Sequence, residues 1–142
     1  MSARFFGRHE HSLDVKGRVI LPARFRREFD SHAYLSQFHD RCLALWTPEE
    51  FERQMEEMES AQDDSREERN AARFWAANSA EVELDKQGRL PIPNYLRDFA
   101  RLEGAVLVNG AINRVELWNP GEWESRMQSS EQRWTEDSQV PQ

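Results

Sequence analysis

The residues best suited to chemistry are an aspartate, a glycine and an arginine that occur twice with the same spacing. The pattern D-x-x-G-R begins at Asp14 and again at Asp85. An aspartate accepts backbone N–H bonds in a tight turn, and a glycine readily takes the positive φ that such turns often need. The arginine beside the turn could grip a phosphate or donate two hydrogen bonds to guanine, whereas it could equally pair with an acid and only fix the loop.

The two patterns and the short segments that follow them contain residues that should shape a loop and cations that could contact DNA. The loop-shaping set is Asp14, Gly17, Asp85 and Gly88. The candidate DNA-binding set is Lys16, Arg18, Arg24 and Arg89. The second copy has Gln87 where the first has Lys16. Its short helix begins with the uncharged pair Asn94 and Tyr95 where the first copy has Ala23 and Arg24, so if DNA is bound we expect the first copy to dominate the binding.

The repetition extends beyond these loops and indicates a duplicated structural unit. The segments around the loops match at an offset of 71, and L-A-L-W-T-P-E-E-F at 43–51 matches V-E-L-W-N-P-G-E-W at 115–123 at an offset of 72. Each unit alone would be marginally stable, so the two should share one core. The expected organisation is a first repeat at 8–59, a connecting helical segment at 60–79, a second repeat at 80–127 and a polar, disordered tail at 128–142.

Local patterns predict strands and helices in the same order in each repeat. Alternating residues bounded by turn signals predict strands at 8–13, 18–21, 33–38 and 42–46, and again at 80–84, 89–92, 105–108 and 114–118. Prolines at the first helical position predict short helices at 22–29 and 93–101 and longer helices that begin at 48 and 120. Thr47 should cap one longer helix in a capping box with Glu50, and Asn119 should cap the other. These elements make the fold mainly β with α-helices, of the α+β class.

Charge is distributed unevenly along the 142 residues. The net charge is −7, yet residues 1–30 carry seven Lys/Arg against four Asp/Glu, and residues 49–68 carry two against ten. A phosphate backbone responds to the local field, so the acidic total does not exclude a nucleic-acid partner. No apolar run is long enough to cross a membrane, and the first residues lack the apolar stretch of a secretory signal. We therefore expect a cytoplasmic protein without a membrane partner.

Motifs for catalysis or cofactor binding do not occur in the sequence. It contains no nucleophile elbow, Walker loop, dinucleotide glycine pattern or H-E-x-x-H zinc motif. His9, His11, His39 and Cys42 do not have the spacing of a strong zinc signature, and Cys42 lies in an apolar run where a thiol packs as a small hydrophobe. We therefore expect no enzyme activity, no metal, no cofactor and no small-molecule substrate.

Three segments of the chain together resemble the MraZ family. They are F-F-G-R-H-E-H-S-L-D-V-K-G-R-V-I-L-P-A-R-F-R near the start, D-K-Q-G-R-L-P-I-P-N-Y-L-R in the second copy, and the closing V-E-L-W. The resemblance covers about residues 3 to 127. It implies two tandem AbrB-like, swapped-hairpin units that form an intramolecular pseudo-dimeric β-barrel with helices on the outside.

The same resemblance implies a function. MraZ proteins are bacterial transcriptional regulators associated with the promoter of the division and cell-wall gene cluster, where they bind short G-rich direct repeats. By position, the D-x-K-G-R region points to Lys16, Arg18 and Arg89 as residues that contact double-stranded DNA. The resemblance also implies a ring-shaped, octamer-like homo-oligomer in the cytoplasm, associated with the nucleoid.

Two other classes of function stay open at this point. One is an AbrB-like antitoxin, or another protein-interaction module, that binds its own operator. Such antitoxins typically carry one copy of the unit and a long disordered arm, so two copies and a short tail favour the regulator. The other is an enzyme that uses the carboxylate-rich helix around Glu56 and Glu57, for which the sequence offers no positioned nucleophile or base.

Overall fold

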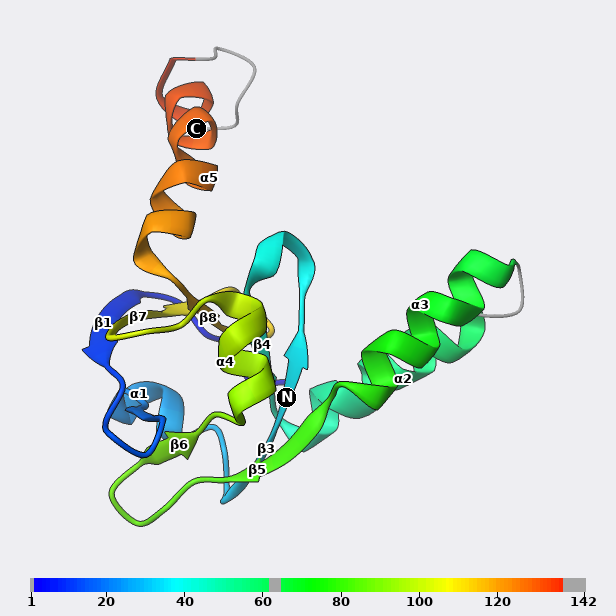
Figure 1. Ribbon diagram of the computed structural model, residues 1–142, viewed down its shortest axis with the longest axis horizontal. Helices are drawn as coiled ribbons and strands as arrows, with labels where there is room; N and C mark the ends of the chain where they lie inside the picture. The colour runs from blue at the N-terminus through cyan, green and yellow to red at the C-terminus, as the bar shows by residue number, and fades with distance from the viewer. Residues whose placement is uncertain (1, 62–64, 137–142) are drawn as a thin grey trace.

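The computed structural model describes residues 2–61 and 65–136, and each half of the chain contributes four strands to it (Figure 1). The first half contains β1 (Arg8–Ser12), β2 (Arg18–Ile20), α1 (Ala23–Arg26), β3 (His32–Gln37), the 3₁₀ turn η1 (His39–Arg41), β4 (Leu43–Trp46) and α2 (Pro48–Ala61). A connecting helix follows, α3 (Arg66–Ala77). The second half contains β5 (Ala80–Glu83), β6 (Arg89–Pro91), α4 (Asn94–Ala100), β7 (Ala105–Gly110), β8 (Val115–Trp118) and α5 (Pro120–Glu136).

The two halves exchange strands. Six strands form an antiparallel sheet in the order β1-β7-β8-β4-β3-β5, so the first strand of each half pairs with a hairpin of the other half. The second strands, β2 and β6, pair with each other in a separate two-stranded ribbon. If the equivalent strands of the two halves are interchanged, the same order is obtained from the opposite edge of the sheet. The fold therefore has a pseudo-twofold axis between β4 and β8. The structure confirms the α+β fold of two cross-paired units, in which the helices span more of the described residues than the strands do.

One apolar core lies between the sheet and the ribbon. Val19 and Leu90 are buried and directly opposite each other in the β2–β6 pairing. They belong to a cluster that also contains Leu35 and Leu45 from the first half and Val108 from the second. Residues of both halves thus bury each other, as expected for units that are each too small to fold alone.

The three long helices lie outside this core, whereas α1 and α4 contribute Phe25 and Leu96 to it. In Figure 1, α5 extends away from the body in one direction, and the α2–α3 pair extends in another. Trp75 of α3 packs against Phe51 of α2, with ring centroids 5.1 Å apart, and Trp123 of α5 packs against Trp118 of β8 at 5.2 Å. Each long helix is therefore fixed to the outer face of the sheet by aromatic contacts near one end.

The caps of the long helices differ from the sequence prediction in one respect. The Thr47 hydroxyl accepts from the Glu50 backbone N–H at 3.2 Å, and the Asn119 side chain accepts from the Glu122 N–H at 3.1 Å, as expected for N-caps. The Glu50 carboxylate instead accepts from Arg53 at 2.7 Å. The predicted bond from the Glu50 carboxylate back to the Thr47 N–H is therefore wrong, because that carboxylate forms an ion pair with Arg53.

Two further predictions are corrected by the helix bounds. The first short helix spans only Ala23–Arg26, which is shorter than the expected 22–29. The expected disordered tail at 128–142 is helical as far as Glu136, because α5 continues through a segment without a proline or glycine to interrupt it. The remainder of that tail, 137–142, lies outside the described residues, as do 62–64 of the connecting segment.

Candidate nucleic-acid interface

The two D-x-x-G-R loops have the same backbone geometry. One oxygen of Asp14 accepts from the backbone N–H groups of Lys16 and Arg18, both at 2.9 Å, and Asp85 does the same for Gln87 and Arg89. Gly17 has φ +76° and Gly88 has φ +78°, a conformation in which a side chain is strained. Each aspartate and each glycine therefore holds its loop in a tight turn just before β2 or β6.

The two arginines lie on the same outward face of the ribbon. Because Val19 and Leu90 point into the core, their neighbours Arg18 and Arg89 point out. The Nε of Arg18 donates to Asp14 at 2.8 Å, and the Nε of Arg89 donates to Asp85 at 2.5 Å. Arg18 Nη1 also lies 3.9 Å from the Asp85 carboxylate, so the two loops converge on one small surface.

This pairing fixes the arginines without burying them. The Arg18 side chain is 24% exposed and that of Arg89 is 33% exposed. A guanidinium has five N–H donors, and the aspartate occupies Nε, so other donors remain for a ligand. The arginines are thus held in a defined orientation with part of each side chain accessible.

Both loop aspartates are ionised at neutral pH. Backbone N–H donation from Arg18 lowers the pKa of Asp14, and donation from Arg89 lowers the pKa of Asp85. Each carboxylate therefore offsets the charge of its own arginine. The positive field above the ribbon must come largely from other residues.

Lysines supply that charge in both loops. Lys16 is exposed in the first loop, and Lys86 is exposed in the second. Lys86 is equivalent to Val15 of the first loop, whereas the residue equivalent to Lys16 is Gln87. Aligning the two loops residue by residue therefore suggests that the second loop has lost its lysine. Counting lysines per loop instead of matching positions would have revealed that the second loop is also basic.

Arg24 contacts the N-terminal segment. It is exposed on α1, and its guanidinium carbon lies 4.2 Å from the ring centroid of Phe6. A cation over an exposed aromatic ring keeps its charge available at the surface. The structure therefore groups Lys16, Arg18, Lys86 and Arg89 around the ribbon, with Arg24 held separately against the N-terminal segment.

His9 and Cys42 of the candidate metal set are held by other contacts. The His9 ring packs edge-on against Phe25 at 5.2 Å. Cys42 is buried, its thiol donates to the His39 carbonyl at 3.4 Å, and burial raises its pKa far above the ordinary value. Over 2–61 and 65–136, no three His, Cys, Asp or Glu side chains are grouped closely enough to hold a metal ion. Within the same ranges, none of the helices combines the length and the apolar character needed to cross a membrane.

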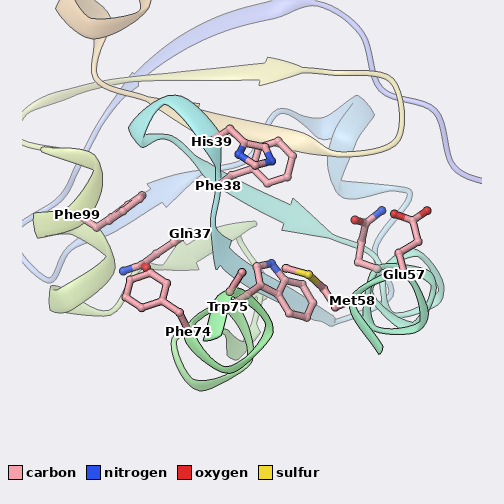
Figure 2. A pocket seen from close by; sticks show the side chains of 10 residues that line it. Gln37, Phe38, His39, Glu57, Met58, Phe74, Trp75 and Phe99 are labelled. Carbon is pink, nitrogen blue, oxygen red and sulfur yellow. The ribbon is translucent and has the colours of Figure 1, made fainter. Parts of the chain in front are cut away.

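A separate apolar cleft lies away from the loops, between α2, α3, α4 and the end of β3. Its volume is about 490 Å³. Figure 2 shows Phe74 and Trp75 on one side, Met58 next to them and Phe99 across the opening. Phe74 is 58% exposed. An apolar cleft with an exposed aromatic rim suits a protein segment better than a charged ligand.

Comparison with known proteins gives a consistent match over both halves. A family model described as "MraZ protein, putative antitoxin-like" matches residues 5–74 and again 76–139. A protein of Acetivibrio thermocellus named "Transcriptional regulator MraZ" is 40% identical over 121 residues, which cover 85% of each chain. A protein of the same name from Cutibacterium acnes is 38% identical over 132 residues, which cover 93% of each chain. Another from Halothermothrix orenii is 35% identical over 132 residues, which cover 93% of this chain and 92% of the relative.

Proposed function

Since the chain belongs to the MraZ family, we propose that it is a transcriptional regulator that binds promoter DNA through its two D-x-x-G-R loops. The observation that carries this proposal is the outward face of the β2–β6 ribbon. There each loop brings an exposed lysine, Lys16 or Lys86, close to an oriented arginine. The relatives are named as regulators of transcription, which supports a DNA partner and a protein without enzyme activity.

The two residue types divide the recognition of DNA between them. Lysine is a flexible point charge that suits phosphates, and a fixed guanidinium suits the O6 and N7 acceptors of guanine. Arg18 and Arg89 are oriented by their aspartates before DNA arrives, so little side-chain freedom is lost on binding. Arg24 on α1 would add a further phosphate contact from outside the ribbon.

The target that this resemblance favours is a set of short direct repeats in the promoter of the division and cell-wall gene cluster. Copies of the chain that assemble into a ring-shaped, octamer-like homo-oligomer would present identical loops at regular spacing. A weak contact from each copy then becomes strong binding through effective concentration. The protein would act in the cytoplasm, on the nucleoid, without a cofactor, a small-molecule substrate or a membrane partner.

The apolar cleft at α2, α3 and α4 is the surface that best fits contact between copies. Its edge carries Glu57 on the acidic helix α2. Helix α5 extends from the body and presents the exposed Trp134, with Arg133 next to it in sequence. An apolar side chain with a neighbouring cation on one copy complements an apolar cleft with an acidic edge on another.

A salt titration tests the DNA-binding proposal. Fluorescence anisotropy would measure the affinity of the wild type, Lys16→Ala and Lys86→Ala for DNA that carries spaced repeats, at several salt concentrations. Each loop variant should bind DNA more weakly. The slope of log affinity against log salt concentration should also become shallower by about 1 per engaged subunit. Arg69→Ala removes one charge from α3, far from the loops in sequence, and should change neither quantity. Equal effects of the Lys16 and Arg69 substitutions would refute the assignment of the loops.

The second candidate is an antitoxin-like protein whose cleft holds a toxin. It is favoured by the wording of the matching family model and by the exposed Phe74. The Phe74→Glu variant distinguishes the antitoxin from the regulator. If it no longer binds a small protein partner but keeps its DNA affinity, the result would support the antitoxin.

A further inference from the structure

We propose that each half of the chain positions the DNA-binding loop of the other half through one arginine. The two residues are Arg97 of α4, which holds the first loop, and Arg26 of α1, which holds the second loop. This inference rests on the proposed function of the loops, but the contacts that carry it do not.

The first contact is between Arg97 and Gly17. A Cβ atom at Gly17 would overlap the Arg97 guanidinium, so that group occupies the space which only a glycine leaves free. Arg97 Nη1 donates to the Gly17 carbonyl at 3.4 Å and to the Ile92 carbonyl at 2.7 Å. Its Nη2 donates to the Asn94 side chain at 3.1 Å. The guanidinium is thus fixed by its own helix and lies against the loop of the other repeat.

The second contact repeats the first with the halves exchanged. A Cβ atom at Gly88 would overlap the Arg26 side chain, and Arg26 Nη1 donates to the Gln87 carbonyl at 3.0 Å. Arg26 and Arg97 occupy the same position in the two repeats. The packing of an arginine on the loop glycine therefore appears twice under the pseudo-twofold relation, while the loop carbonyl that accepts from it is that of Gly17 in one loop and that of Gln87 in the other.

The antiparallel ribbon explains why the contacts cross between the halves. Arg18, at the start of β2, is opposite Pro91 at the end of β6. The helix that follows β6 therefore begins beside the loop that precedes β2, and the Ile92 N–H donates to the Gly17 carbonyl at 3.1 Å. The reciprocal bond runs from the Leu21 N–H to the Gly88 carbonyl at 2.9 Å. The glycine of D-x-x-G-R is thus needed for close approach as well as for its positive φ.

These contacts make Arg26 and Arg97 positioning residues and not DNA contacts. Both side chains are partly buried beneath the loops, whereas Lys16 and Lys86 are exposed. Loss of either arginine should loosen the loop of the opposite repeat and leave its own loop unchanged.

Hydrogen exchange of the free protein tests this crossed pattern. Arg97→Lys keeps the charge but loses the flat guanidinium, and it should speed exchange in the peptide 13–19 and not in 84–90. Arg26→Lys should do the reverse. Arg27→Lys, at the exposed neighbour of Arg26, is the matched control and should alter neither peptide. Faster exchange in the variant's own loop, in both loops equally or in neither would overturn the proposal.

DNA titration then separates this inference from the proposed function. Arg97→Lys should weaken DNA binding roughly three- to tenfold, the effect of losing one hydrogen-bonded contact. In that background Lys16→Ala should cost less affinity than in the wild type, while Lys86→Ala should cost the same. A crossed exchange pattern with unchanged DNA affinity would support the positioning contacts and contradict DNA binding by the loops. Faster exchange that does not follow the crossed pattern, together with weakened DNA binding, would contradict the positioning contacts and support DNA binding by the loops.

Discussion

The loop aspartates each serve a backbone turn and an arginine at once. One oxygen of Asp14 accepts from two backbone N–H groups, and the other accepts from the Arg18 side chain. Asp85 repeats this arrangement with Arg89. The structural and functional interpretations of D-x-x-G-R are therefore compatible, because the ion pair that fixes the loop also orients the arginine.

The lowered pKa of these aspartates predicts how their contribution depends on pH. The pKa of each carboxyl lies below 3.8 in the folded protein, so the stabilisation is complete above that value and is lost as pH falls through the lower, folded pKa. Urea unfolding of the wild type and of Asp14→Asn/Asp85→Asn should give clearly different midpoints at pH 7 and pH 5. The difference should narrow at pH 3, which lies below 3.8, because the carboxyls of the unfolded wild type are then largely protonated and folding must release those protons.

Other carboxyl groups titrate in both proteins, and their effects cancel in the comparison. A difference between the two midpoints that stays constant from pH 7 to pH 3 would show that the ionised aspartates do not stabilise the loops.

At the scale of elements, the sequence predicts most strands and helices because their signals are local. Alternation predicted the strands, and proline with an N-cap residue predicted where α2 and α5 begin. The end of α5 was missed because a polar helix without an apolar stripe resembles a disordered tail in composition. The lysine in the second loop was missed because Lys86 is shifted by one position relative to Lys16.

The exchange of strands between the halves follows from the resemblance and not from local patterns. No property of residues 8–12 shows that β1 pairs with β7, almost 100 positions away, instead of with β2. Likewise, the contact of Arg97 with Gly17 joins residues 80 positions apart. Such pairs depend on topology, which periodicity along the chain does not encode.

The proposed assembly places the contact between copies at the α2–α3 pair and α5. Phe74→Glu places a charge in the apolar cleft and should lower the mass of the assembly measured by light scattering. Phe74 is exposed in the single chain, so the fold should survive the change. Met55→Glu, at an exposed position elsewhere on α2, is the control and should leave the mass unaltered. An unchanged mass for Phe74→Glu would exclude the cleft as the assembly surface.

At the scale of the whole molecule, the pseudo-twofold axis makes one chain resemble a dimer with two unlike D-x-x-G-R loops. The pairing of β2 with β6 brings the loops together, and the six-stranded sheet fixes both halves to one core. Duplication allows the loops to diverge while the scaffold stays symmetric. Lys16 and Lys86 at neighbouring positions are an example of this divergence.

The most direct test of DNA binding by the loops is site-specific photocrosslinking. Val15 is fully exposed in the first loop, at the position equivalent to Lys86, so Val15→Cys adds a thiol without removing a charge. Cys42 is buried with a raised pKa and should not react with the crosslinking reagent in the folded protein. The wild type then reports the background, and Ser60→Cys on α2 provides an exposed control position.

Each variant would carry the same photoreactive group, and the yield of protein–DNA adduct with promoter DNA would be measured after irradiation. The loop label at position 15 should give adducts in high yield, and the α2 label at position 60 should give a yield close to that of the wild type. Equal yields from the two labels would contradict the central claim that the paired loops of the ribbon bind DNA.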